Sequence, residues 1–408
     1  MMRFFFPDSQ DLVSPTYDFL HDEYSPLRVR QRDDLYAHEV LESAPYDGLL
    51  VSKAIVDGSA RGAGKYSAPQ RERLYRLGIR RFFRLPDVVE SMGDCGAFNY
   101  VGEDKPPYTV NEVLDFYESC GFDSGVSVDH LILSYDQNLG LRGAPREWRD
   151  RRKLSLHLAE EFLACVRDRR SPVRPVGAAQ GWSPKSYADS VRQLQDMGYD
   201  RIALGGMVPL KTPAILACLE KIDQIRKPDT ELHLLGITRI DSMGEFSDFG
   251  VVSFDSTSAF RQAFMDDRRN YHTASTYYVA VRVPQVDGNI TLKRAVLAGV
   301  VSQREAVITE RECLKRLRGL DDGTTEVEQA LEVLSDYERI TMSKKSYLEQ
   351  YRRTLTDAPW RVCPCALCRE HGVDIAIFRG TERNKRRGFH NLFVLRNRMQ
   401  RIPTTTPT

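Results

Sequence analysis

The sequence predicts an α/β fold, a TIM (β/α)8 barrel that carries a helical insertion and a small C-terminal lobe. Two observations support the barrel. Short apolar runs alternate with amphipathic helical segments through most of the first 300 residues, as a parallel α/β fold requires. Several of these runs end directly on polar or glycine residues, and barrel enzymes build their active sites from strand carboxyl ends. In the clearest case, GVVSFDST, the strand expected over residues 251–254 leads into Asp255.

The barrel elements are expected in order from residue 47. The DGLLV run at 47–51 is expected to form the first strand, and further strands are expected near residues 126, 173, 201, 232 and 250. The helix expected over 109–119 begins with Thr109 and Glu112, which have the spacing of a capping box. The helix that follows Ser183 has a proline in its first turn. Both helices are expected to end at a glycine.

Beyond residue 302 the sequence becomes charged and helix-favouring, with few strand signals. These properties predict an α-helical insertion over residues 302–358. Over the whole chain, 58 basic residues nearly balance 57 acidic ones, so only local clusters of charge inform on binding partners. Eight cysteines, without a secretory signal or a membrane-spanning segment, lead us to expect a reducing, cytoplasmic setting and no membrane partner.

Three cysteines and a distant histidine predict a structural zinc (Zn2+) site. Cys363, Cys365 and Cys368 lie within six residues of one another, and His390 follows 22 residues later. Three thiolates and one imidazole close a tetrahedral site, which leaves no position for a catalytic water and argues against a zinc-dependent hydrolase. Three alternatives remain open. The cysteines can be reduced and buried without a metal, Cys365 and Cys368 can form a redox pair, and His371 is a rival fourth ligand.

Basic residues surround this cluster. Between residues 379 and 401 there are eight Lys or Arg against one acid, Glu382. Such a cluster is typical of a phosphate-contacting surface, although a solvated helix face gives the same pattern. We expect nucleic acid to bind through four of these side chains, Arg383, Lys385, Arg386 and Arg387.

The chain is therefore expected to contain four segments. They are an N-terminal extension (1–46), a TIM-barrel catalytic domain (47–301), the helical insertion (302–358) and a zinc-binding basic lobe (359–408).

The order of the motifs resembles that of the tRNA-guanine transglycosylase superfamily, barrel enzymes with a C-terminal zinc lobe that exchange guanine for a 7-deazaguanine base. The motifs are GDCGAF, VDH, AQG, LGGM, SFD and CxCxxC with a distant histidine. They cover most of residues 47–300 and 360–395. The whole chain, from MRFFFPDSQDLV onward, is more similar to the DNA-acting branch, the 7-deazaguanine DNA transglycosylases, which insert bases such as preQ0 into DNA.

The resemblance implies roles for individual residues. Asp255 matches the nucleophile and Asp94 the general acid/base, because base exchange with retained configuration needs two displacements through a covalent aspartyl–sugar intermediate. In the base pocket, Asp129 is expected to accept hydrogen bonds from the guanine-like edge. Gln180 and a backbone N–H of the glycine pair are expected to donate to its carbonyl oxygen, and an aromatic ring to stack on it. The base-binding residues implied in this way are Asp129, Gln180, Gly205, Gly206 and Phe98.

The chain departs from the tRNA enzymes in two motifs, and its helical insertion (302–358) separates the barrel from the zinc lobe much further than in those enzymes. His130 and Leu131 stand where those enzymes have an acidic residue and a cysteine. Cys95, Ala97 and Asn99 replace a Ser, a Gly and a Gln. We therefore expect the incoming base to be discriminated differently.

The first hypothesis is a DNA guanine transglycosylase that acts on a guanine taken out of the duplex. The resemblance further implies a 7-deazaguanine base as substrate, a structural zinc ion and an ATPase partner protein. One alternative is a tRNA-guanine transglycosylase. The other is a non-catalytic nucleic-acid-binding subunit of the same fold, against which the presence of both Asp94 and Asp255 argues.

Overall fold

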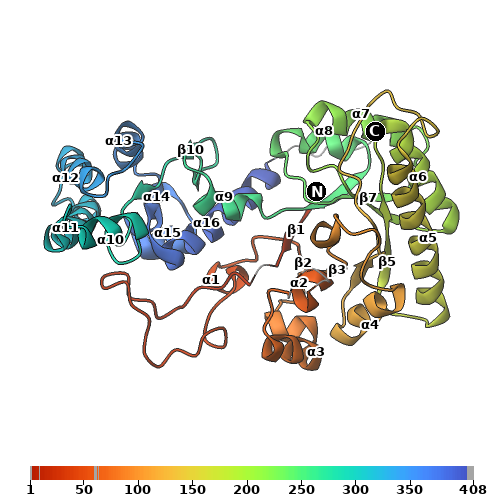
Figure 1. Ribbon diagram of the computed structural model, residues 1–408, viewed down its shortest axis with the longest axis horizontal. Helices are drawn as coiled ribbons and strands as arrows, with labels where there is room; N and C mark the ends of the chain where they lie inside the picture. The colour runs from red at the N-terminus through yellow and green to blue at the C-terminus, as the bar shows by residue number, and fades with distance from the viewer. Residues whose placement is uncertain (1, 9, 59–61, 63, 402–408) are drawn as a thin grey trace. The chain divides into compact units, whose positions relative to one another are not determined.

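The computed structural model describes residues 2–8, 10–58, 62 and 64–401 and divides into two compact units (Figure 1). The barrel unit comprises residues 1–10, 46–257 and 398–408, and the lobe unit comprises residues 11–45 and 258–397. No helix in the described part of the chain is long and apolar enough to cross a membrane.

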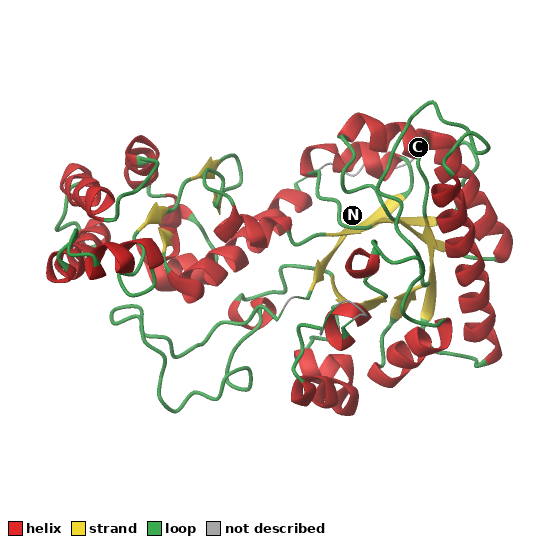
Figure 2. Ribbon diagram, viewed as in Figure 1, coloured by secondary structure: helices red, strands yellow, loops and turns green. Residues whose placement is uncertain are grey.

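The barrel unit contains a closed barrel of eight parallel strands, in which each strand pairs with the next and the last pairs with the first. This arrangement confirms the predicted barrel. Helices surround the strands in Figure 2. The strands are β1 (Arg3–Pro7), β2 (Gly48–Ser52), β3 (Glu90–Asp94), β4 (Ser124–Val126), β5 (Arg174–Ala179), β6 (Arg201–Leu204), β7 (Glu231–Leu234) and β8 (Val251–Asp255).

The prediction that DGLLV forms the first strand is wrong. That run forms β2, and the earlier RFFFP run forms β1, which pairs with β2 and β8. Phe4 stacks on Phe254 of β8 at 5.2 Å, and Phe6 stacks on Tyr46 at 5.6 Å. A parallel strand that is buried on both faces has a continuous apolar run instead of alternating apolar and polar residues. The three successive phenylalanines have this pattern, and they form the middle of β1.

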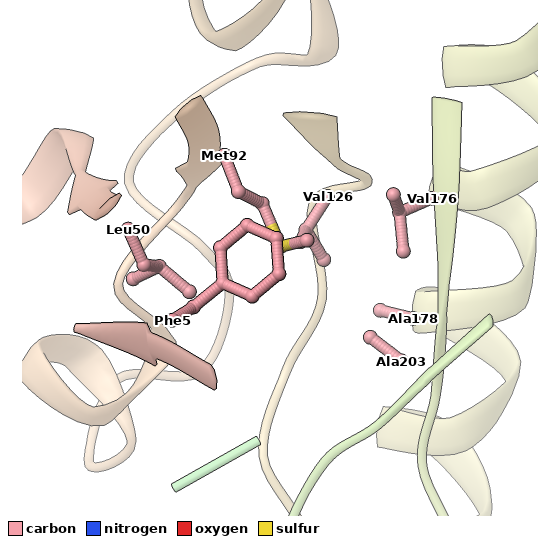
Figure 3. Close-up of a cluster of buried hydrophobic side chains, with 7 residues drawn as sticks. All are labelled: Phe5, Leu50, Met92, Val126, Val176, Ala178 and Ala203. Atoms are coloured by element: carbon pink, nitrogen blue, oxygen red, sulfur yellow. The ribbon is translucent and has the colours of Figure 1, made fainter. Parts of the chain in front are cut away.

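Side chains from six strands fill the interior of the barrel (Figure 3). All are at most 4% exposed. This layer is a packed core rather than a pore, as in other barrels of eight strands. It confines the chemistry to the ends of the strands. Its residues are Phe5, Leu50, Met92, Val126, Val176, Ala178 and Ala203.

Two of the outer helices, α4 and α6, begin and end where local signals place them. The Thr109 hydroxyl accepts the backbone N–H of Glu112 at 3.2 Å, and Gly121 ends this helix with φ of +70°. Ser183 caps a later helix, which Gly198 ends with φ of +110°, a backbone conformation that favours glycine. The helices of the barrel unit are α2 (Lys53–Asp57), α3 (Ala68–Phe83), α4 (Val110–Cys120), α5 (Arg146–Asp168), α6 (Pro184–Met197), α7 (Thr212–Asp223) and α8 (Met243–Asp248).

A network of charges closes the amino-terminal end of the barrel. Arg201, which is 2% exposed, donates to Glu90 at 2.7 Å and to Glu231 at 3.0 Å. Arg3 also donates to Glu90, at 2.8 Å. These four residues are the first residues of β6, β3, β7 and β1. Pairing with two carboxylates compensates for the burial of the Arg201 guanidinium, so this end has a structural rather than a catalytic role.

The lobe unit is mainly helical, and its helices within residues 302–358 agree with the predicted helical insertion. Residues 258–301, expected in the barrel domain, belong to this unit because β8 already completes the barrel at Asp255. Part of the expected N-terminal extension, residues 11–45, also belongs to it.

The helices of the lobe unit are α1 (Ala37–Val40), α9 (Ser258–Met265), α10 (Ile290–Leu297), α11 (Gln303–Asp321), α12 (Val327–Ile340), α13 (Leu348–Asp357), α14 (Pro359–Val362), α15 (Ala366–His371) and α16 (Gly380–Gln400), the last of which ends in the barrel unit. Its short strands are β9 (Tyr271–His272), β10 (Tyr277–Tyr278), β11 (Val281–Arg282) and β12 (Ile377–Phe378).

Candidate active site and metal centre

Asp255 is the last residue of β8 and is 7% exposed. Its Oδ1 accepts the backbone N–H of Gly236 at 2.9 Å and lies 3.2 Å from Nε2 of His233. The other ring nitrogen of His233 lies 2.8 Å from the hydroxyl of Ser253. Among the described residues, Oδ2 of Asp255 has no hydrogen-bond partner. One carboxylate oxygen is therefore fixed, and the other is available for a reaction.

His233 is a residue that the sequence analysis missed. It is completely buried in β7. The available signal was a histidine inside the otherwise apolar run LHLL, which follows Glu231. Because β7 and β8 are neighbours in the barrel, the side chain reaches the end of the adjacent strand.

Asp94 is the last residue of β3. Its carboxylate accepts from the hydroxyl of Ser52, at the end of β2, at 2.8 Å and from the backbone N–H of Gly96 at 3.0 Å. Burial raises the pKa of Asp94, the hydrogen bond from Ser52 opposes this shift, and the negative charge of Asp255 raises the pKa further. Two carboxyl groups whose environments differ in this way are suited to two different chemical roles.

Asp129 and Gln180 lie together beyond the ends of β4 and β5. Both are almost completely buried. Nε2 of Gln180 donates to Oδ2 of Asp129 at 2.5 Å, while Oε1 of Gln180 accepts the backbone N–H of Ile132 at 3.3 Å. Burial, followed by the charge of Asp94, raises the pKa of Asp129 to about 7. The structure thus brings two of the predicted base-binding residues into direct contact.

The glycine pair after β6 completes this cluster. A Cβ added to Gly205 would lie 2.2 Å from Nε2 of Gln180, and one added to Gly206 would lie 2.4 Å from the carbonyl oxygen of Ile132. Gly206 also has φ of +75°. The N–H of Gly205 already donates to the carbonyl of Ala179 at 3.0 Å. Of the two expected backbone donors, Gly206 is therefore the better candidate.

Cys95 connects Asp129 to a second residue that the sequence analysis missed, Tyr100. The Cys95 thiol donates to Oδ1 of Asp129 at 3.2 Å. The Tyr100 hydroxyl lies 2.9 Å from Sγ of Cys95 and 3.1 Å from the backbone carbonyl of Asp129. The cysteine that distinguishes this chain from the tRNA enzymes is thus a direct contact of the candidate base-binding carboxylate.

The neighbouring predicted residues lie in different environments. Phe98 is 51% exposed in the short helix η1 (Ala97–Tyr100) that follows Asp94, and its stacking role stays a prediction. His130 is completely buried, with Nε2 2.8 Å from the carbonyl of Glu103. Burial lowers the pKa of His130, so this histidine is neutral near pH 7.

The four predicted metal ligands converge in the lobe unit. Their ligand atoms all lie within 4.8 Å of one another, and Nδ1 of His390 lies 3.4 to 3.6 Å from the sulfur atoms of Cys363, Cys365 and Cys368. This Cys3His group can bind a metal ion. The rival ligand, His371, is not part of the group; its ring packs against Phe19 at 4.7 Å.

Residues around His390 fix its ring. Nε2 of His390 lies 2.8 Å from the backbone carbonyl of His272, so the proton on Nε2 leaves Nδ1 free to face the cysteines. The ring of Tyr271 stacks on His390 at 4.3 Å, and its hydroxyl lies 3.2 Å from Sγ of Cys368.

The prediction of a phosphate-contacting surface is wrong for three of its four residues. Arg383, Arg386 and Arg387 are at most 3% exposed. Arg383 donates to Asp374 at 2.9 Å and pairs with Asp22. The other two donate to backbone carbonyls, Arg386 to Ser14 at 2.6 Å and Arg387 to Ala263 at 2.6 Å.

Residues 11–45 explain this difference for Arg383 and Arg386, because Asp22 pairs with Arg383 and backbone carbonyls of the segment accept from both side chains. The partners of Arg387 lie elsewhere in the lobe unit. Lys385 is partly exposed, but it also donates to this segment, at the carbonyl of Leu12. A run of basic residues reports charge, whereas exposure depends on partners that lie far away in the sequence.

The comparisons with known proteins agree with this geometry. No family model matches the chain. The chain is 48% identical to a DNA-guanine transglycosylase of Salmonella montevideo over 405 residues, which are 98% of this chain and 97% of that protein. The similarity therefore extends over both the barrel unit and the lobe unit.

Proposed function

Because the chain belongs to the DNA-guanine transglycosylase family, we propose that it replaces a guanine in DNA with a 7-deazaguanine base of the preQ0 type. The observation that carries the proposal is the pair of carboxyl groups at the carboxyl ends of β3 and β8, on the same rim of the barrel. Asp255 has one oxygen without a partner among the described residues, and Asp94 has a raised pKa. A nucleophile and a proton donor are the two groups that such an exchange needs.

In the proposed mechanism, Oδ2 of Asp255 attacks the anomeric carbon of the deoxyribose, and the bond to guanine breaks. Asp94 gives its proton to the departing guanine. The ionised Asp94 then takes the N9 proton of the incoming 7-deazaguanine, whose nitrogen attacks the sugar and releases Asp255. Two inversions retain the configuration of the sugar. His233 and Gly236, which hold Oδ1, act as positioning residues for the nucleophile.

The buried cluster is suited to reading a guanine-like edge. In the proposed complex, ionised Asp129 accepts from the ring N–H and the exocyclic amino group. One N–H of Gln180 is already used on Asp129, so its second N–H donates to the carbonyl oxygen of the base, together with the N–H of Gly206. A site built from such directional groups rejects bases that lack the matching donors, because its buried polar atoms would then be left unpaired.

The metal group is suited to zinc. Zn–S bonds of about 2.3 Å and Zn–N bonds of about 2.05 Å in a tetrahedron place sulfur and nitrogen about 3.6 Å apart, close to the 3.4 to 3.6 Å observed here. Four protein ligands leave no position for water, so we assign zinc a structural role. The 97% coverage of a relative named for DNA favours DNA over tRNA as substrate. An ATPase that opens the duplex remains a proposed partner.

Base exchange tests the proposal directly. The purified protein is incubated with labelled 7-deazaguanine base and either duplex DNA or bulk tRNA, and the nucleic acid is digested to nucleosides. We expect the label in a deoxynucleoside. Label in ribonucleosides alone would support the tRNA alternative. Absence of label from both, with and without a cell extract that supplies an ATPase, would favour the non-catalytic subunit.

The base should bind more tightly as the pH rises through 7. The pKa of Asp129 is raised to about 7, so this carboxyl group is protonated below that pH and ionised above it, and only the ionised form accepts both hydrogen bonds. Since the apparent Kd scales inversely with the competent fraction, binding should strengthen by about tenfold between pH 6 and pH 8. The measurement is the equilibrium Kd of the free base, because the rate of turnover would also depend on the protonation of Asp94 as general acid/base. A Kd that is constant over this range would contradict the role of Asp129.

A further inference from the structure

A pocket of about 230 Å3 on the lobe unit is lined by none of the residues of the Cys3His group or of the candidate active site. Its volume is several times the roughly 30 Å3 that one water molecule occupies, which is enough for the ring of a nucleobase. The side chains that line it are mainly aromatic and cationic. They include Arg268, Tyr277, Tyr278, Gln350, Arg353 and Thr354.

The two tyrosines are held rigidly. They form β10, which pairs antiparallel with β9. The Tyr278 hydroxyl donates to Asp357 at 2.9 Å, and the guanidinium of Arg353 lies 4.8 Å from the centre of the Tyr278 ring. The Tyr277 ring meets His272 edge-on at 4.9 Å. Fixed aromatic rings lose little conformational entropy when a planar ligand stacks on them.

β9, the strand that pairs with β10, is joined to the Cys3His group. Tyr271 and His272, which form β9, are the residues that stack on His390 and accept its Nε2 proton. β9 thus links the Cys3His group to β10, which carries the two tyrosines.

Two arginines, Arg268 and Arg353, give the pocket positive charge. Arg268 is exposed, and its side chain has no ion-pair or hydrogen-bond partner among the residues that the structure describes. The neighbouring Arg269 lies 5.6 Å from the ring centre of Tyr277. Asp266 accepts the backbone N–H groups of both arginines, at 2.7 and 2.8 Å, and so fixes their turn. Asp357, the acid beside Tyr278, is already paired with Arg353.

We propose that this pocket binds one unpaired nucleotide of DNA, with its base stacked on the tyrosine rings and its phosphate at Arg268. The identification of this nucleotide rests on the proposed function, because extraction of a guanine from the duplex leaves the nucleotide opposite it unpaired. Aromatic rings beside arginines are how proteins hold unpaired bases without reading their sequence. The pocket also supplies the lobe unit with the DNA contact that the buried arginines of α16 do not.

Binding of a fluorescein-labelled oligo-dT of about 15 nucleotides tests this inference. We expect Tyr278→Leu to weaken binding by at least about fivefold. Tyr278→Phe, which keeps the ring and loses the same hydrogen bond to Asp357, should stay within about twofold of wild type. Arg268→Ala should weaken binding and reduce the slope of log K against log salt by about 0.7. Arg304→Ala removes an exposed arginine outside the pocket and should change neither quantity.

Wild-type affinity in both Tyr278→Leu and Arg268→Ala, or no binding of oligo-dT by the wild type, would overturn the inference. If Tyr278→Leu melts early or loses its metal, the exposed Arg268→Ala variant decides alone. Base exchange by the wild type is measured in parallel. If the wild type exchanges bases but the pocket variants bind oligo-dT as the wild type does, only this inference is refuted. If the pocket variants weaken oligo-dT binding but the wild type exchanges no base, only the proposed function is refuted.

Discussion

Asp255→Asn should abolish incorporation of the 7-deazaguanine base, with a loss of at least about 10⁴-fold in kcat, as expected when a covalent nucleophile is removed. The amide keeps the size of the side chain and can still bind Gly236 and His233 at the positions that hold Oδ1. Binding of DNA should therefore survive. The measurement is base exchange together with a covalent protein–DNA adduct, trapped by denaturing the protein after incubation with DNA and no free base.

Asp94→Asn provides the informative comparison. Removal of a general acid/base costs about 10² to 10⁴-fold, yet Asp255 would still be present, so a slowly formed adduct should be detectable. Asp229→Asn, a change at an exposed acid of the barrel unit, should leave exchange unchanged. An adduct in Asp255→Asn at the wild-type level would show that another residue attacks the sugar.

Cys365→Ser, or removal of the metal by a chelator, should unfold the lobe unit. A structural zinc site contributes about 10 kcal/mol or more of binding free energy, which is comparable to the entire stability of a typical domain, about 5 to 15 kcal/mol. Cys365 also accepts the first backbone N–H bond of α15, from Cys368 at 3.4 Å. The expected result is loss of bound zinc and a large fall in the melting temperature.

Cys165→Ser is the matched control for this change. Cys165 is a free, partly exposed cysteine of α5, outside the metal group. It should keep both the metal content and the melting temperature of the wild type. A Cys365→Ser variant that loses its zinc but melts as the wild type does would show that the metal is not structural.

The sequence predicted correctly the positions that are determined by residues close by in the chain. Asp255 and Asp94 each end a strand, and the ends of parallel strands meet at one rim wherever the barrel closes. The spacing of Cys363, Cys365 and Cys368 constrains a metal loop directly. Such patterns can be recognised in the sequence without knowledge of the fold.

The wrong and missed predictions concern residues whose environment is determined by distant parts of the chain. Burial of Arg383 depends on Asp22, which lies 361 residues earlier, and no local pattern reveals that pairing. The RFFFP strand was missed because its apolar run is only three residues long, and only its pairing with β2 and β8 shows that it is a strand of the barrel. His233 stands in a run that reads as ordinary strand, and only the closed barrel brings it to Asp255.

The interleaving of the two units has a consequence for the order in which the protein folds during synthesis. Residues 11–45 are synthesised long before their partners, because the backbone N–H of Ser14 binds Glu382, 368 residues later. Residues 3–7 likewise wait for β8 before the barrel can close. The lobe unit cannot be completed from a nascent chain that lacks its last third, because residues 258–397 belong to it, whereas all eight barrel strands precede residue 256. Contacts of such long sequence separation slow folding. This protein should therefore depend on chaperones more than a barrel made of one continuous segment.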